Sequence, residues 1–403
     1  MTKFNVKTLY IYKFIGSLLP IYAFYQILFL ERGQSISDIA ILLALWSFFS
    51  IFFEFPSGVL ADRWNRRNML AIGSFLKSLC FVTWYFSHSF FMFAVGFFLW
   101  AIGGAFFSGT EEGLIYDNLK SDGDEESFTK VYGRAQFCSN VGSFIGIASA
   151  GAMVSFISVD VISLISAGIC FISVIFAMQI REKNFYSERL EKSEQSGDKA
   201  PGVFSAFFDT FREASLFIKG SKVALISILF LVLFSSLGGY LDEFDAFIIN
   251  DFGISLVWVS VILTVRTVFV ALGDLLAPKV QRWFPNIGRI FLLSITTFIL
   301  LAIFTLIWHQ YAILIFGLAF MILTITEILL VNVLQSEIKE EGRATVMSFY
   351  SVGQNVAMIC LSLIYGLLAG IFTLQQVYII ITLYGFIGGL GFYFLYIIAN
   401  KSK

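Results

Sequence analysis

Long runs of apolar residues, separated by short polar breaks, make up almost the whole chain. An α-helix needs about 20 residues to cross a bilayer, and runs of this length recur twelve times. They are unbroken, whereas the strands of outer-membrane barrels alternate in short segments. The pattern therefore predicts an all-α integral membrane protein with twelve transmembrane helices. Their approximate limits are 8–30, 38–61, 69–87, 90–117, 135–157, 161–180, 223–249, 255–277, 290–308, 311–335, 344–370 and 376–399.

One long polar segment, 181–221, interrupts this alternation and divides the spans six and six. We predict that it is a cytoplasmic linker between an N-terminal six-helix bundle, 1–180, and a C-terminal six-helix bundle, 222–403. Within the linker, 204–218 places phenylalanines on one helical face. This spacing is typical of an amphipathic helix that lies on the membrane surface, and partner binding is the alternative.

The two halves repeat short motifs at equivalent spans. The Gly-Arg-Ala at 133–135, where the fifth span begins, returns at 342–344 at the start of the eleventh. The Thr-Glu at 110–111 in the fourth span returns at 326–327 in the tenth. These matches predict a parallel duplication of six spans, with a binding site between the halves near the middle of the membrane.

Composition and charge narrow the class of protein further. The chain is 58% hydrophobic and 14% charged, with a mean hydropathy of +0.83, whereas soluble domains carry about 25% charged residues. It has 27 basic and 28 acidic residues, so no excess of positive charge suggests nucleic acid. Nearly all the basic residues fall on one set of alternate connections. By the positive-inside rule, both termini are cytoplasmic in a multi-pass protein of the inner or plasma membrane.

Cysteine and histidine add no cofactor chemistry. The four cysteines lie inside apolar runs without paired spacing, which predicts small buried side chains, and two histidines cannot build a metal site alone. We expect no metal and no cofactor. The expected partners are a small-molecule substrate, protons and the lipid bilayer, without nucleic acid, and the chain is expected to act as a monomer.

The connection after the second span carries a recognisable motif. It reads Gly-Val-Leu-Ala-Asp-Arg-Trp-Asn-Arg-Arg at 58–67. This resembles the Gly-x-Leu-x-Asp-Arg-x-x-Arg-Arg signature of the major facilitator superfamily, except that Asn65 stands where the family usually has Gly. The resemblance implies the major facilitator fold and a gate that locks the cytoplasmic side; a basic loop that only fixes orientation is the alternative. The expected gate residues are Gly58, Asp62, Arg63, Arg66, Arg67, Asp117, Arg134 and Arg343.

The fifth span resembles part of another motif of this superfamily. Gly142, Gly146 and Gly151 match glycines found in its drug antiporters, but Ile147 stands where the antiporters have Pro. The partial match favours export over uptake. Small residues at this spacing also let helices pack closely, which is a sufficient structural explanation.

Ionisable side chains inside spans cost about 2.5–3.5 kcal/mol each on insertion scales, so they usually face a cavity or a partner. A poorly hydrated cavity disfavours the charged form of a carboxylate, and a nearby cation competes with its proton. Static pairing, such as Arg266 with Asp242 or Glu243, is the alternative. Lys77 lies in a span that is peripheral in this family, so we expect it to be structural. The candidates for proton coupling or the substrate cavity are Lys13, Glu111, Glu112, Asp242, Glu243, Arg266 and Glu327.

These features predict a secondary active transporter that works by alternating access. The leading hypothesis is efflux of a small hydrophobic or amphipathic compound in exchange for protons. Proton-coupled uptake of a metabolite and a non-transporting sensor on a transporter fold are the alternatives. An enzyme is not expected, because the sequence contains no nucleotide-binding loop, nucleophile motif or metal cluster.

Overall fold

The computed structural model describes residues 5–182, 222–337 and 343–401, and these residues form helices and no strand. The chain divides into two compact units, Met1–Phe207 and Phe208–Lys403. The first unit contains α1 (Val6–Ser17), η1 (Pro20–Ala23), α2 (Tyr25–Glu31), α3 (Ile36–Arg63), α4 (Arg66–Phe86), α5 (Phe90–Phe107), α6 (Thr110–Asp122), η2 (Glu125–Ser127), α7 (Phe128–Met153) and α8 (Val159–Gln179). The second contains α11 (Lys222–Asp251), α12 (Leu256–Val280), α13 (Ile287–Ile307), η3 (Gln310–Ala312), α14 (Ile313–Glu337), α15 (Arg343–Ala369) and α16 (Leu374–Lys401).

The predicted all-helical membrane architecture is confirmed. Within the described residues, 11 helical stretches are long and apolar enough to cross a membrane, with α1–α2 and α5–α6 each counted as one. The remaining predicted span corresponds to α7, which is 26 residues long but is not among those stretches, because polar and small residues such as Gln136, Asn140 and Ser143 lower its mean hydropathy. The predicted linker and its amphipathic segment, 204–218, lie outside the described residues.

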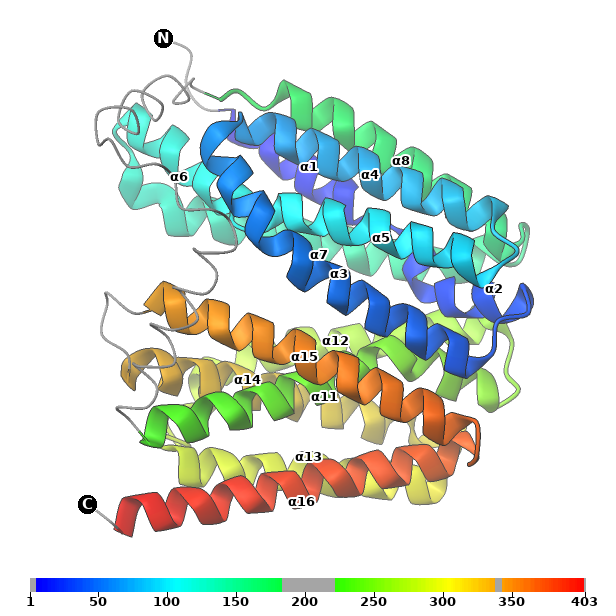
Figure 1. Ribbon diagram of the computed structural model, residues 1–403, viewed down its shortest axis with the longest axis vertical. Coiled ribbons are helices and arrows are strands. Elements are labelled where there is room, and N and C mark those ends of the chain that lie inside the picture. The colour runs from blue at the N-terminus through cyan, green and yellow to red at the C-terminus, as the bar shows by residue number, and fades with distance from the viewer. Residues whose placement is uncertain (1–4, 183–221, 338–342, 402–403) are drawn as a thin grey trace. The chain divides into compact units, whose positions relative to one another are not determined.

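Each unit packs its helices by the same scheme. In the first unit, α1 contacts α7 and α8, α5 contacts α3 and α4, and α4 contacts α8 (Figure 1). In the second, α11 contacts α15 and α16, α14 contacts α12 and α13, and α13 contacts α16. Helices at equivalent places in the sequence therefore make equivalent pairs in both units, as a parallel repeat of six spans requires.

Two spans that were predicted to be continuous are broken in the first unit. The first is interrupted after Ser17, because Pro20 begins η1 and Leu19 before it is extended (φ −118°, ψ 94°), the conformation that a following proline favours. A backbone N–H at such a break needs a new acceptor in the membrane. Ile21 N–H finds one in Ser166 Oγ on α8, at 3.2 Å.

The fourth span is broken between α5 and α6. Gly109 has a φ of +66°, a left-handed conformation that glycine adopts without the strain a Cβ would cause. The break places Thr110, Glu111 and Glu112 in the first turn of a new helix. The partial positive charge at a helix N-terminus favours acidic side chains there. The new helix N-terminus thus helps to stabilise the charge of Glu111 within the membrane span.

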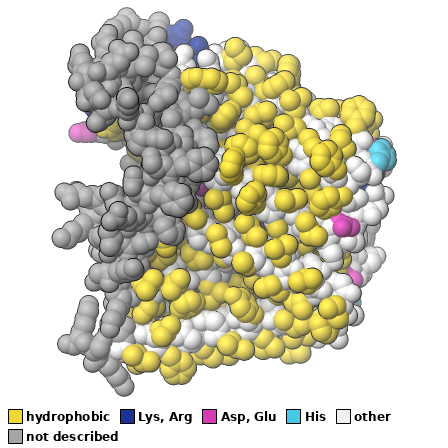
Figure 2. Space-filling model, in the orientation of Figure 1, with side chains coloured by type: hydrophobic (Ala, Val, Ile, Leu, Met, Phe, Trp, Pro, Cys, Tyr) yellow, Lys and Arg dark blue, Asp and Glu magenta, His cyan; other side chains and the backbone are white. Residues whose placement is uncertain are grey.

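Large apolar side chains cover the outside of the helices. In the face seen in Figure 2, hydrophobic side chains form an almost continuous surface over the described elements, with few charged groups. Phe48, Phe91 and Leu367 are 54%, 73% and 71% exposed. A water-soluble protein rarely leaves so large an apolar surface open, whereas lipid is a suitable solvent for it.

Candidate functional site: a polar pocket in the first unit

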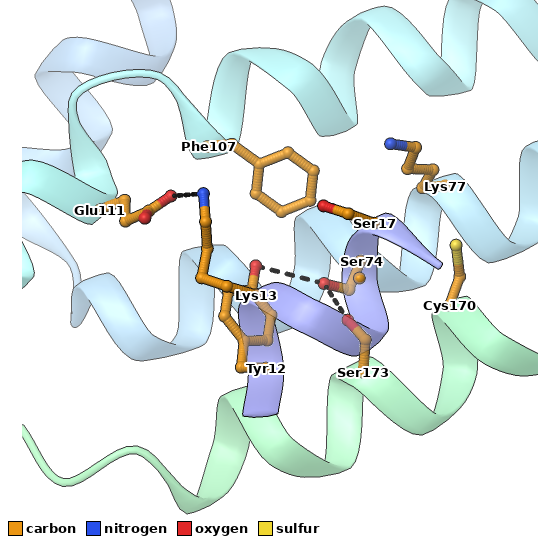
Figure 3. Close-up of a pocket in the computed structure, with 10 residues that line it drawn as sticks. Tyr12, Lys13, Ser17, Ser74, Lys77, Phe107, Glu111, Cys170 and Ser173 are labelled. Atoms are coloured by element: carbon orange, nitrogen blue, oxygen red, sulfur yellow. Dashed lines mark hydrogen bonds and ion pairs between the residues drawn. The ribbon is translucent and has the colours of Figure 1, made fainter. Parts of the chain in front are cut away.

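A cavity of about 130 Å³ opens inside the first unit, next to both helix breaks. Its walls come from α1, α4, α8 and the α5–α6 junction (Figure 3). The lining residues are mostly polar, in a region where the surrounding helices are apolar. They are Tyr12, Lys13, Gly16, Ser17, Ser74, Lys77, Phe107, Glu111, Cys170 and Ser173.

An ion pair closes one side of the pocket. Lys13 Nζ on α1 donates to Glu111 Oε2 on α6 at 2.7 Å, and the two side chains are only 14% and 11% exposed. The second carboxylate oxygen, Glu111 Oε1, is buried and has no hydrogen-bond partner among the described residues. A buried acceptor without a donor is unusual, and it leaves a position where a proton can bind. The structure thus brings together two of the residues predicted from sequence.

A chain of hydroxyl groups forms the floor of the pocket. Ser173 Oγ on α8 donates to Ser74 Oγ on α4 at 3.0 Å, and Ser74 Oγ lies 3.5 Å from the hydroxyl of Tyr12 on α1 (Figure 3). Ser17 Oγ and Ser139 Oγ are 2.6 Å apart. Hydroxyl groups both donate and accept, so this floor can adapt to different polar groups.

Lys77 was expected to be peripheral and structural, and the expected position is wrong because Lys77 lines the pocket. The Nζ of Lys77 lies 5.2 Å from the ring centre of Tyr22 and 5.4 Å from that of Trp100. These two rings stack on each other, with centres 5.3 Å apart. Cation–π attraction stabilises an ammonium at such a place. In Figure 3 the ring of Phe107 lies between Lys77 and the Lys13–Glu111 pair.

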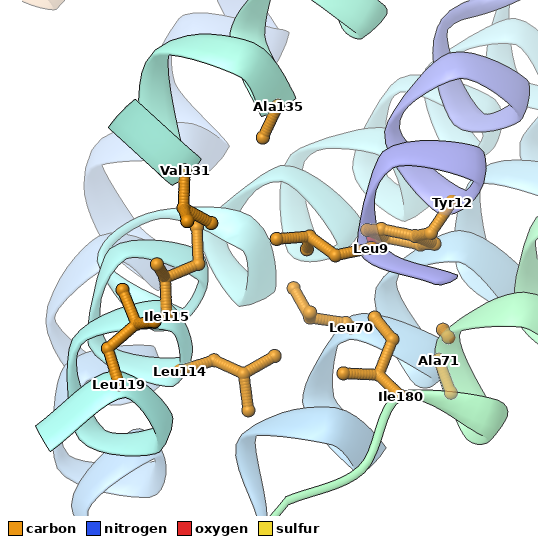
Figure 4. Packing of buried hydrophobic residues seen from close by; sticks show 11 residues of the cluster. Leu9, Tyr12, Leu70, Ala71, Leu114, Ile115, Leu119, Val131, Ala135 and Ile180 are labelled. Atoms are coloured by element: carbon orange, nitrogen blue, oxygen red, sulfur yellow. The ribbon is translucent and has the colours of Figure 1, made fainter. Parts of the chain in front are cut away.

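A compact apolar core holds the pocket residues of α1 and α6 in place. It joins α1, α4, α6, α7 and α8 (Figure 4). Leu9 and Ile115 are fully buried in it. Glu112, next to Glu111, is directed to a different partner, because its Oε1 accepts a 3.0 Å hydrogen bond from the hydroxyl of Tyr132 on α7. Glu112 therefore does not line the pocket, unlike Glu111.

A second charged cluster lies in the second unit, between α11 and α12. Arg266 Nη1 contacts Asp242 Oδ1, and Arg266 Nε lies 3.0 Å from Asp245 Oδ2. Asp245 is 3% exposed, and the guanidinium lies 4.9 Å from the ring centre of Phe320. Both aspartates contact the arginine because residues three apart share a helix face. Glu243 is on the same helix and partly buried.

Glu327 has a neutral partner. The hydroxyl of Tyr350 on α15 lies 3.4 Å from Glu327 Oε1 on α14, a long hydrogen bond. Sequence matching pairs Glu327 with Glu111 of the first unit, so the same repeat position has an ammonium partner in one unit and a phenol in the other.

At one end of the first unit, Arg66 Nη1 donates to Asp117 Oδ2 at 2.8 Å. Gly113 makes room for this contact, since a Cβ there would lie 2.1 Å from Arg66 Nη1. The carboxylate of Glu182 accepts hydrogen bonds from the backbone N–H groups of Arg66 and Arg67, at 2.9 and 3.0 Å. An acidic group at the start of α4 suits the positive end of that helix.

For most of the other predicted gate residues, the structure describes the backbone but not the side chain. Gly58, Asp62 and Arg63 lie in the last turns of α3, and Arg343 begins α15, but their side chains are outside the described part of the chain. Arg134 on α7 is exposed and lies beside the hydroxyl of Tyr10 on α1. It is not part of the Arg66–Asp117 pair.

The glycines of α7 lie against the broken first span. A Cβ at Gly142 would lie 2.3 Å from the backbone oxygen of Phe14, and one at Gly146 would lie 2.7 Å from the backbone nitrogen of Leu19. Gly151 is buried further along the same helix. Two of the three predicted packing glycines therefore hold α7 in backbone contact with the wall of the pocket.

Sequence reasoning missed the hydroxyl floor and left Asp245 out of the predicted site. Ser74 and Lys77 are three residues apart, and this spacing on an apolar helix was an available signal of a shared polar face. Ser173 gave no such signal, because its partner Ser74 comes from a distant span. The sequence places Asp242 and Asp245 on one helix face at i, i+3, and that relation is the signal that favours including Asp245.

Two compact helical units with equivalent packing, each carrying charged groups inside apolar spans, define a polytopic membrane protein. Comparison with known sequences identifies the family. The sequence model of the Major Facilitator Superfamily matches residues 9–339, and the chain belongs to this superfamily of transporters. It is a multi-pass membrane transporter.

Individual relatives agree with this assignment. An uncharacterised MFS-type transporter of Bacillus subtilis, YfkF, is 39% identical over 62 residues, 15% of this chain and 14% of that protein. A mutant of the nucleoside transporter NupG has a similar structure, with a TM-score of 0.79, 15% identity and coverage of 97% and 99% of the two chains. The structure of a D-xylose–proton symporter is also similar, with a TM-score of 0.70 and 13% identity, over 96% of this chain and 95% of that one. At these identities the likeness shows the fold alone.

Proposed function

We propose that this transporter is proton-coupled and that Glu111 is the group that binds the transported proton. The observation that carries the proposal is the Lys13–Glu111 pair at 2.7 Å in the wall of a pocket, with a buried Glu111 Oε1 that has no hydrogen-bond partner among the described residues. One carboxylate oxygen is thus held by a cation and the other is available to a proton.

The coupling step follows from competition for one carboxylate. When a proton binds Glu111, the carboxyl becomes neutral and loses most of its attraction for Lys13. The ammonium is then free to move to a hydroxyl of the pocket floor. When the proton leaves, Lys13 returns to Glu111. A transporter that alternates between two states can use this exchange to link proton and substrate movement.

Export of a small amphipathic compound in exchange for protons is the direction we propose. It is supported by the partial match of Gly142, Gly146 and Gly151 to the glycines of the antiporter motif; the backbone contacts of Gly142 and Gly146 are explained by close helix packing alone. The Arg66–Asp117 pair supports a gate at the end of the unit that the charge distribution assigns to the cytoplasm. In this proposal both termini are cytoplasmic and the membrane is the cell membrane.

Uptake with protons is a second candidate, because the pocket contains two basic side chains, Lys13 and Lys77, and one acidic side chain, Glu111. Protonation of Glu111 increases the net positive charge there, so an anionic cargo and a proton would bind more tightly together than alone. This arrangement favours movement of both in the same direction.

Reconstituted vesicles with an imposed pH gradient test the proposal. A susceptibility panel, comparing cells with and without the protein, first selects compounds whose toxicity changes. We expect flux of a selected compound that collapses when a protonophore is added. Flux opposite to the proton gradient supports export, and flux along it supports uptake. Flux that persists unchanged with the protonophore contradicts proton coupling.

A further inference from the structure

Lys77 differs in its surroundings from Lys13, the other basic side chain of the first unit's pocket. Among the described residues, no carboxylate lies within ion-pair distance of its Nζ, whereas Lys13 is paired with Glu111. The stacked rings of Tyr22 and Trp100 support the ammonium, and the side chain lines the cavity. A positive charge inside a membrane protein is costly without a counter-charge.

The surroundings of Lys77 are suited to a small negatively charged group. The hydroxyl chain in the same cavity runs from Ser173 to Ser74 and ends at Tyr12, so the Tyr12 O–H is left to donate to a ligand. Phe107 supplies an apolar wall. The acid in the cavity, Glu111, is already held by Lys13. An entering anion would therefore meet an ammonium and a neutral hydroxyl donor, with a ring against its apolar part.

We propose that the pocket binds a small organic monoanion, with Lys77 as its counter-charge and the Tyr12 hydroxyl as a hydrogen-bond donor. One unpaired ammonium matches a single carboxylate or sulfonate group better than a phosphate dianion. Phe107 and a cavity of about 130 Å³ fit a compact apolar body such as one ring. This inference deepens the proposed transport function, because it names the class of substrate for the same pocket.

Binding to the purified full-length chain in detergent tests the inference without requiring transport. The probe is benzenesulfonate, which stays charged at all usable pH values. Benzenesulfonamide has the same ring but no charge and is the matched control ligand. Isothermal titration calorimetry is expected to show saturable binding of the sulfonate and much weaker binding of the sulfonamide. No sulfonate binding, or equal binding of both compounds, overturns the inference.

Variants then locate the charge that is responsible. We expect Lys77→Met to weaken sulfonate binding about tenfold or more and Lys77→Arg to retain most of it. Lys120→Met is the control, because exposed Lys120 also lies over an aromatic ring, that of Tyr116, outside the pocket. Gel filtration checks that each variant is folded. Unchanged affinity in folded Lys77→Met overturns the inference, and if that variant does not fold, the comparison of the two ligands on the wild-type chain decides.

The binding experiment and the flux experiment can fail independently of each other. Sulfonate binding without gradient-driven flux retains the anion site and contradicts the proposed coupling. Gradient-driven flux of another compound, with no sulfonate binding, retains the coupling and contradicts the anion site.

Discussion

The two units share a packing scheme but differ in the continuity of their helices. In the first, the spans that hold Lys13 and Glu111 are broken next to the pocket, at Leu18–Leu19 and at Ser108–Gly109. Their counterparts in the second unit, α11 and α14, are continuous over 30 and 25 residues. Broken helices are where other transporters place binding sites. The difference indicates that the first unit carries the more specialised site.

The two units also differ in how their intramembrane charged side chains are paired. Glu111 has an ammonium partner that a proton can displace, whereas the partner of its counterpart Glu327 among the described residues is the hydroxyl of Tyr350. The second unit instead surrounds Arg266 with Asp242 and Asp245. Protonating one of these two carboxylates still leaves Arg266 paired with the other. We interpret the first cluster as a switch and the second as a fixed lock that stabilises α11 against α12.

The largest effect on stability is expected at the lock. Arg266→Met leaves the buried carboxylate of Asp245 without its cation, and breaking a buried pair in this way costs about 3–5 kcal/mol. Thermal unfolding in detergent measures the loss, with exposed Arg289→Met as a control. Adding Asp245→Asn should recover part of the stability. A single Arg266→Met variant as stable as the wild type would show that the cluster is not a lock.

A double-mutant cycle on Lys13→Met and Glu111→Gln measures the switch. Because each change leaves a charge or a donor without its partner, the double variant should lose less stability than the sum of the singles. We expect a coupling free energy of about 0.5–3 kcal/mol, below the effect at Arg266. Strictly additive losses would mean that the pair seen at 2.7 Å makes no energetic contribution.

The break between α5 and α6 gives a third comparison. Gly109→Ala places a Cβ on a residue with a φ of +66°, which costs about 1–2 kcal/mol. Gly104 is the matched control, since it is helical and a Cβ there meets no atom within 4 Å. Gly104→Ala should be neutral or slightly stabilising. Equal effects of the two substitutions in thermal unfolding would argue against a strained break.

The smallest effect is expected at Glu327. Tyr350→Phe removes one hydrogen bond of 3.4 Å, and ordinary hydrogen bonds contribute about 0.5–1.5 kcal/mol each. We expect a loss near the lower end of that range and little change in the pH dependence of flux. If the pH profile of this variant shifted more than that of Lys13→Met, the assignment of the switch to the first unit would be reversed.

The order of the spans and the repeat were predictable because hydrophobic length and short motifs are local properties of the sequence. The helix breaks were not predicted, although Pro20 and Gly109 were visible, because apolar runs continue across both. The intramembrane acids were found as candidates since charge is rare in such runs. The pairing of Arg266 with Asp242 was predicted as an alternative and is present, but the partner of Glu111 was not: Lys13 meets Glu111 only through the packing of α1 on neighbouring spans. Lys77 enters the pocket because α4 packs against both α5 and α8.

Flux through Glu111→Gln vesicles tests the central claim most directly. The substitution keeps the shape of the side chain and removes its ability to bind and release a proton. With a compound selected by the susceptibility panel, we predict that gradient-driven flux falls to the level of empty vesicles. Exchange between labelled and unlabelled compound, without a pH gradient, should continue. Exposed Glu125→Gln, in the same unit, should behave as the wild type. Gradient-driven flux of wild-type size through the Glu111→Gln variant would contradict the account.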